Sequence, residues 1–67
     1  MFFVIGDLVK VVHIKACSKH LLGQMGIVID ALDMSGGYTM YEVLIDGTPE
    51  WIDDVHLEKL TEPAEKR

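Results

Sequence analysis

The 67-residue chain has only one cysteine and only six lysine and arginine residues, and each scarcity excludes a class of protein. Cys17 has no second cysteine to pair with, so no disulfide within the chain stabilises the fold. Six basic against 11 acidic residues give a formal charge of −5, which argues against a default function of binding a phosphate backbone. No stretch approaches the roughly 20 apolar residues of a membrane span. The apolar residues 1–5 lack the basic flank of a secretion signal, and Gly6-Asp7 ends them. We therefore expect a cytoplasmic protein.

What the chain does contain is a series of short apolar, β-branched runs bounded by glycine and aspartate. They lie at residues 6–12, 23–29, 41–47 and 50–60. Such runs are the signature of a small all-β barrel. A chain of this length buries only about 60% of its unfolded surface, so it needs efficient packing, a metal or self-association for stability. Of these three we favour self-association.

The spacing predicts five strands in one domain over residues 1–60. Asp46-Gly47 is a hairpin turn signal because both residues tolerate positive φ. Asp53 is placed to cap a single 3₁₀ turn before the last strand, and Gly26 is expected to mark a bulge or a sharp bend. The expected strands are residues 8–14, 25–30, 38–45, 48–52 and 57–60, with loops at 15–24 and 33–37, an apolar arm or leading strand at 1–5 and a frayed polar tail at 61–67.

The first expected strand is apolar on both faces. Val9 and Val11 would lie on one face, and Leu8, Val12 and Ile14 on the other. Strands of this kind are usually buried on both sides. Because a five-stranded barrel has one interior, either the N-terminal arm or another chain must cover the second face. By contrast, the strand at 38–45 alternates near its end, with Tyr41, Val43 and Ile45 on one face and Glu42 and Asp46 on the other.

Several of these segments together resemble the SH3-like small barrels. The resemblance rests on Gly-Asp-Leu-Val-Lys-Val at 6–11, Gly-Gln-Met-Gly-Ile-Val at 23–28, Tyr-Glu-Val at 41–43, Glu-Trp-Ile at 50–52 and Leu-Glu at 57–58. The chain is most similar to short bacterial and tailed-phage proteins of that type, most of them uncharacterised. The likeness implies a five-stranded SH3-like barrel, and the host cytoplasm if the chain is phage-encoded.

The second segment also resembles a KOW motif, in which Gly-x-x-Gly-x-Val turns into a strand. KOW domains are usually basic, whereas this chain is acidic. Peptide-binding SH3 domains have an acidic first loop and clustered aromatics, whereas residues 15–23 are basic and contain no aromatic residue. These motifs occupy turn and core positions, so they indicate a fold more than a function.

Charge is divided along the chain. Between Leu8 and Ile29 there are three lysines and two histidines but no acid, and between Asp30 and Glu58 there are eight acids but no lysine or arginine. If the first loop projects, Lys15, Lys19 and His20 form a basic tip on an acidic body. Such a tip could bind a phosphate, a nucleic-acid strand or the acidic face of a neighbouring subunit. Alternatively, the strands interleave and the charges pair or are solvated.

Three groups of residues are candidates for metal binding or catalysis. His13, Cys17 and His20 form an H-x₃-C-x₂-H run, but a structural zinc site normally has four ligands and His56 is the only obvious fourth. Cys17 with His20 lacks a third group to orient a nucleophile and its base. Asp30 with Asp33, and Asp53 with Asp54, suit turn caps better than paired catalytic carboxylates. The chain contains no P-loop, G-x-S-x-G or dinucleotide-binding fingerprint. We predict no metal, no cofactor and no enzymatic activity.

The aromatic residues Tyr38, Tyr41 and Trp51 come from the two strands joined at Asp46-Gly47. They are either core packing or an exposed strip that grips a partner.

The sequence therefore favours a non-enzymatic interaction or assembly module that binds a protein, copies of itself included. The candidate partner-binding residues are Lys15, Lys19, His20, Tyr38, Tyr41 and Trp51. The alternative is a KOW-type nucleic-acid-binding accessory protein, in which the basic loop contacts phosphates and Tyr38 or Trp51 stacks on bases. A third reading is a small regulator that inhibits an enzyme with its acidic face.

Overall fold

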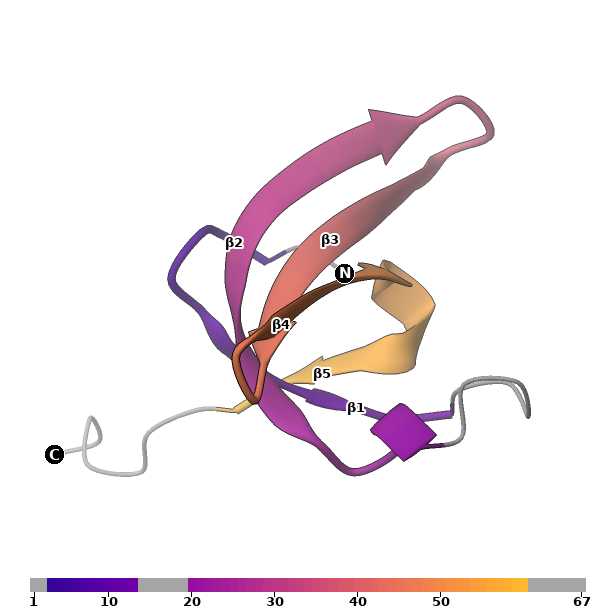
Figure 1. Cartoon of the computed structure of the whole chain (residues 1–67). Coiled ribbons are helices and arrows are strands. Elements are labelled where there is room, and N and C mark those ends of the chain that lie inside the picture. The colour runs from indigo at the N-terminus through magenta and orange to yellow at the C-terminus, as the bar shows by residue number, and fades with distance from the viewer. Residues whose placement is uncertain (1–2, 14–19, 61–67) are drawn as a thin grey trace, which may run out of the picture.

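The computed structural model describes residues 3–13 and 20–60 and folds them into one antiparallel sheet (Figure 1). The strand order is β4-β3-β2-β1-β5. The strands are β1 (Leu8–Val11), β2 (Met25–Met34), β3 (Tyr38–Ile45), β4 (Thr48–Asp53) and β5 (Leu57–Lys59). The all-β prediction is confirmed. Since β4 and β5 are the two edges and no ladder joins them within the described residues, the sheet is not closed. No helix in these ranges is long and apolar enough to cross a lipid bilayer.

Two predicted turns are present. Ile45 pairs with Thr48 across a two-residue loop in which Asp46 has φ 52° and Gly47 has φ 80°, the double positive φ of a type I′ hairpin turn. A 3₁₀ turn, Asp54–His56, connects β4 to β5. The Asp53 side chain accepts a hydrogen bond from the Val55 N–H and so caps this turn, as predicted.

Two strand boundaries differ from the prediction by more than one residue. β1 ends at Val11 and does not reach residue 13, because Val12 donates to the His56 carbonyl and His13 takes a φ of 51°. β2 runs four residues past the predicted end at Asp30, since β3 pairs with it up to Met34. The predicted loop 33–37 shrinks accordingly to a turn, and β2 and β3 extend together beyond the rest of the sheet (Figure 1).

The predicted irregularity in β2 lies at Ile29 and not at Gly26. The register changes between Val28 and Asp30, which leaves Ile29 as the extra residue of a bulge. Gly26 has a different role, because it faces β3 at close range. A Cβ atom there would collide with the Leu44 carbonyl oxygen and come within 2.7 Å of a Val43 methyl group. Glycine thus allows β2 to cross tightly over its neighbour.

The core lies on the inner face of the coiled sheet and includes the N-terminal arm. Phe3 is buried there, with its ring centroid 5.1 Å from that of Tyr41 in an edge-to-face arrangement, and its N–H donates to the Tyr41 hydroxyl at 3.1 Å. A turn follows, in which the Asp7 N–H donates to the Val4 carbonyl. The core residues are Phe3, Val9, Val11, Leu21, Val28, Tyr41, Val43, Ile45, Ile52 and Leu57. The arm therefore closes the inner face and leaves the outer face of β1 uncovered.

Candidate interaction surface

The residues predicted to bind a partner are divided between core, surface and the part of the chain that is not described. Lys15 and Lys19 lie outside the described residues. Tyr41 is only 2% exposed, so it belongs to the core and not to a partner-binding strip. The reason is the strand alternation, which points it inward with Val43 and Ile45. Tyr38 and Trp51 are exposed on the outer face, as a partner-binding role requires.

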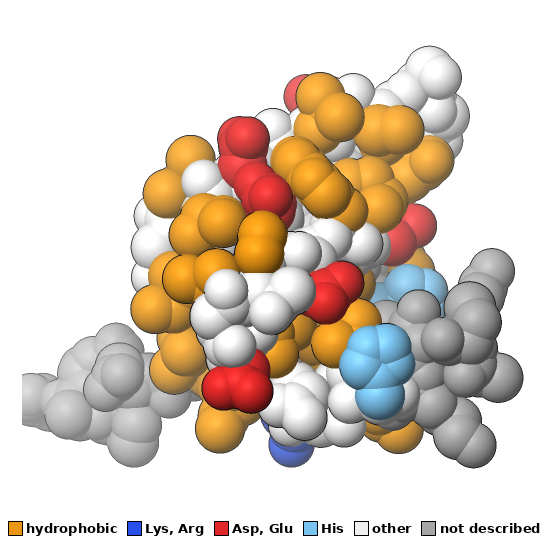
Figure 2. Space-filling view, viewed as in Figure 1, with side chains coloured by type: hydrophobic (Ala, Val, Ile, Leu, Met, Phe, Trp, Pro, Cys, Tyr) orange, Lys and Arg blue, Asp and Glu red, His pale blue; other side chains and the backbone are white. Residues whose placement is uncertain are grey.

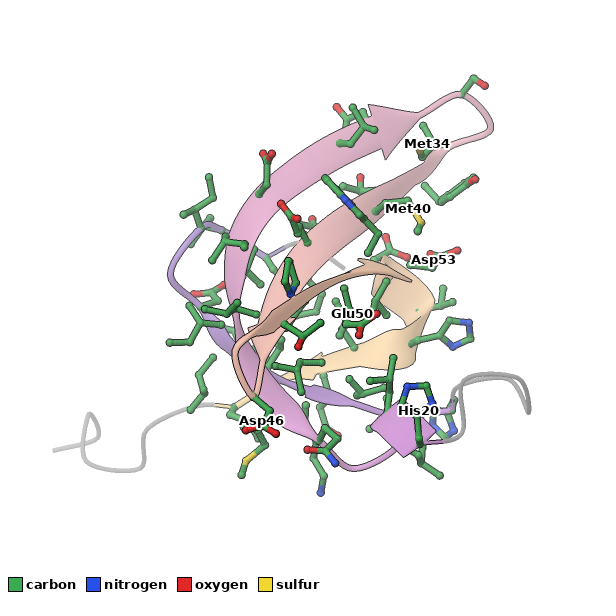
Figure 3. All side chains as sticks on the ribbon, viewed as in Figure 1. His20, Met34, Met40, Asp46, Glu50 and Asp53 are labelled. Carbon is green, nitrogen blue, oxygen red and sulfur yellow. The ribbon has the colours of Figure 1, made fainter. Side chains whose placement is uncertain are left out.

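His20 is exposed and lines a shallow hollow together with acidic groups. The hollow has a volume of ≈ 180 Å³, below the roughly 300 Å³ at which small-molecule pockets begin. Figure 3 labels three of its lining residues, His20, Asp46 and Glu50. The sequence placed His20 on a basic tip, but in the structure it shares this hollow with two carboxylates. Within residues 3–13 and 20–60, no three histidine, cysteine or acidic side chains are grouped to hold a metal ion.

The outer face of the sheet carries the most distinctive arrangement of side chains. Cross-strand pairing places Leu8 opposite Ile27, Ile27 opposite Leu44, and Leu44 opposite Pro49. These four residues form one apolar row across β1, β2, β3 and β4. Leu8, Ile27 and Leu44 remain 41%, 45% and 40% exposed, so nothing in the described chain covers them.

Charged side chains lie on both sides of the apolar row. Two residues before Leu44 on β3, Glu42 lies opposite Asp30 on β2 and Trp51 on β4. This row of two acids and a tryptophan is the acidic row. On the other side, Lys10 of β1 lies between Met25 of β2 and Glu58 of β5. The outer face therefore carries two acids on one side of its apolar row, and a lysine with an acid opposite it on the other.

Beyond the acidic row, the outer face becomes apolar again. Leu32 lies opposite Met40, and Met34 lies opposite Tyr38. Figure 3 labels Met34 and Met40 near the free end of the β2–β3 hairpin. Figure 2 shows hydrophobic side chains gathered along β2 and over this hairpin, with acidic side chains among them. Tyr38 and Trp51 thus share a face, although they lie in different rows and form no common cluster.

Sequence reasoning had assigned one polar and one apolar face to the third strand, and so missed Leu44 as a surface residue. The signal was present in the segment Met25-Gly26-Ile27-Val28-Ile29. Like the first strand, this segment has apolar residues at both odd and even positions, and therefore on both faces. Two apolar faces on neighbouring strands indicate that the outer surface of the sheet is apolar where those strands pair.

No family model, no curated protein and no solved structure matches this chain significantly. The surface itself is therefore the only guide to function.

Proposed function

We propose that this chain is a non-enzymatic protein-interaction and assembly module, built on an SH3-like barrel, whose outer sheet face binds a second copy of the chain. Two features support the barrel assignment: the continuous order β5-β1-β2-β3-β4 and the 3₁₀ turn before the last strand. The sequence analysis predicted five strands and this turn.

The observation that carries the proposal is the exposed apolar row. Leucine and isoleucine contribute about 1.5–3 kcal/mol each when fully buried, so covering the exposed 40–45% contributes about 1 kcal/mol per side chain. Single exposed apolar residues are ordinary, but contiguous apolar patches on a small domain mark interaction sites. In a symmetric dimer both copies bury the same residue, so each residue of the row contributes its burial free energy twice.

The geometry of the row favours a second copy as the partner. Lys10 and Glu42 lie on opposite sides of the apolar row. A two-fold axis running along the row reverses the strand direction of the second copy. This places Lys10 of each copy on the acidic side of the other while the apolar rows meet. The contact is therefore self-complementary in its apolar groups, whereas Glu58 accompanies Lys10 to the acidic side of the other copy.

The nucleic-acid alternative has less support on the described surface. Residues 3–13 and 20–60 hold nine acidic side chains and two lysines. His20, the one described residue of the expected basic tip, lines a hollow with Asp46 and Glu50. These carboxylates repel phosphate groups, and phosphate neutralisation dominates the affinity of nucleic-acid binders.

The test compares variants of the row with a matched variant elsewhere. Ile27→Thr with Leu44→Thr keeps strand-compatible side chains but removes apolar surface from the row. Val55→Thr removes a methyl group from an exposed residue of the 3₁₀ turn. We expect sedimentation velocity to show self-association that the double variant weakens about a hundredfold, from about 2–3 kcal/mol lost over two copies. Val55→Thr should match the parent protein.

Two results would contradict the proposal. A parent protein that stays monomeric to near-millimolar concentration excludes self-association. An unchanged association constant in the double variant shows that the outer face is not the contact. A titration with short RNA and DNA at low salt tests the alternative, which predicts amide shifts that reverse as salt is added.

A further inference from the structure

One edge of β2 is open at its far end. β1 pairs with β2 only as far as Ile27, and the backbone of Gly6 and Asp7 then bonds to Val28. Beyond the bulge at Ile29, residues 31–34 pair with β3 on one side. No described residue pairs with them on the other side. Figure 1 shows this part of the β2–β3 hairpin extending away from β1 and β5.

The backbone groups on this open edge belong to Ala31 and Asp33. In an antiparallel ladder, successive residues direct their N–H and C=O groups alternately to the two sides. The Ala31 N–H does not bond to β3, because it donates to the carboxylate of Asp30 at 2.8 Å. Ala31 and, two residues on, Asp33 therefore present their N–H and C=O groups to the open edge. Exposed edges of this kind are templates for another strand.

We infer that this edge pairs with the same edge of a second copy, antiparallel, about a two-fold axis at Leu32. This register places Ala31 opposite Asp33 of the second copy, and Asp33 opposite Ala31, which forms four backbone hydrogen bonds. Each Asp30 then lies opposite a Met34, so no acid faces an acid. Leu32 meets its own copy at the axis, on the outer face.

The neighbouring registers are worse for identifiable reasons. Moving the axis to Asp33 places two Asp33 carboxylates directly opposite each other, and like charges in that position are destabilising. Moving the axis to Ala31 places Ala31 opposite Ala31 of the second copy, and the contact then has two backbone hydrogen bonds and not four. It also places Leu32 opposite Asp30 of the second copy. The pairing about Leu32 is therefore the self-complementary one.

Asp30 restrains this pairing. Its carboxylate occupies the Ala31 N–H that the second copy needs, so that bond must break before the edges join. The edge contact uses Ala31, Leu32 and Asp33, whereas the outer-face contact uses the apolar row. The two contacts are independent, and a chain that makes both assembles beyond a dimer.

Cross-linking at the axis tests the geometry. Opposite residues at a non-hydrogen-bonded antiparallel position lie at a Cα separation that suits a disulfide. In a Cys17→Ser background, Leu32→Cys should form a covalent dimer under mild oxidation with oxidised glutathione. Leu22→Cys is the matched control, because Leu22 and Leu32 are 52% and 53% exposed and Leu22 lies off the edge. The inference would be overturned if Leu32→Cys formed the covalent dimer no faster than Leu22→Cys.

Two further variants act on the backbone. Ala31→Pro removes the edge N–H, which bonds within the chain only to Asp30. This variant should abolish cross-linking through Leu32→Cys and should leave the circular dichroism spectrum unchanged.

Asp30→Ala frees the same N–H and should strengthen the edge contact about tenfold. Glu58→Ala is the control: it removes an exposed acid from β5 and should leave the strength of the edge contact unchanged. Because Asp30→Ala is expected to gain association, misfolding cannot imitate its result; unchanged or weaker association overturns the inference.

The outcomes separate the two contacts. If Ile27→Thr with Leu44→Thr abolishes all association and Leu32→Cys does not cross-link, the edge inference is wrong and the outer-face proposal holds. If cross-linking at position 32 survives in that double variant, the edge contact exists independently of the outer face.

Discussion

The contact between Phe3 and Tyr41 is the clearest test of how this small core is completed. Phe3 comes from the N-terminal arm and reaches the inner face of β3, where its ring packs edge-to-face on Tyr41 and its N–H donates to the Tyr41 hydroxyl. Phe3→Ala removes the ring, whereas Tyr41→Phe keeps both rings and removes only the hydrogen-bond acceptor. The pair of variants therefore separates packing from hydrogen bonding.

The expected effects are large for a domain of this size. Removing a buried phenylalanine side chain costs about 3–5 kcal/mol, and a 67-residue domain has a total stability of roughly 3–10 kcal/mol. Phe3→Ala should therefore lower the melting temperature by more than about 12 °C or unfold the chain. Tyr41→Phe leaves a buried N–H of Phe3 without its acceptor and should cost about 1–3 kcal/mol.

Urea unfolding followed by far-ultraviolet circular dichroism measures both changes. Val4→Ala is the matched control, because Val4 adjoins Phe3 but is exposed, and it should change stability by less than about 0.5 kcal/mol. If Phe3→Ala loses no more than Val4→Ala, then the arm is not part of the core. If Tyr41→Phe is neutral, the hydroxyl contributes nothing to holding the arm.

Two further predictions concern backbone positions, each measured as a shift in the midpoint of thermal unfolding. Gly26→Ala should cost at least about 2 kcal/mol, since the added methyl group meets the backbone of Leu44 and a Val43 methyl group and the backbone cannot move aside; a neutral variant would show that β2 does not cross β3 this closely. Gly47→Ala should cost about 1 kcal/mol, because φ is 80° there although the space around it is open. Stability equal to the parent protein would rule out the type I′ turn.

Much of the fold was predictable because its signals are local. The turn at Asp46-Gly47 depends on two adjacent residues that tolerate positive φ. The cap by Asp53 depends on a hydrogen bond that its side chain accepts from the N–H of Val55, two residues further along the chain. The burial of Tyr41, Val43 and Ile45 follows from a period of two along one strand. None of these features requires knowledge of distant parts of the chain.

The features that were mispredicted depend on the neighbouring strand. β2 reads as ending at Asp30, yet it continues because β3 offers a partner as far as Tyr38 and the Thr39 hydroxyl donates to Asp33. The bulge lies at Ile29 because the ladders on its two sides are out of register. Gly26 appeared to be a bend, but its environment is a backbone carbonyl from another strand.

By itself, the sequence determined that the chain is all-β, where its tight turns lie and which residues of β3 face inward, because turn chemistry and side-chain alternation act over a few residues. Only the tertiary structure decided that Phe3 closes the core, that Leu8, Ile27 and Leu44 form one exposed row, and that the edge at Ala31 is open. Those three features depend on register and on which strands become neighbours. Register is a relation between segments up to 50 positions apart, as Val9 and Lys59 are, and no local pattern specifies it.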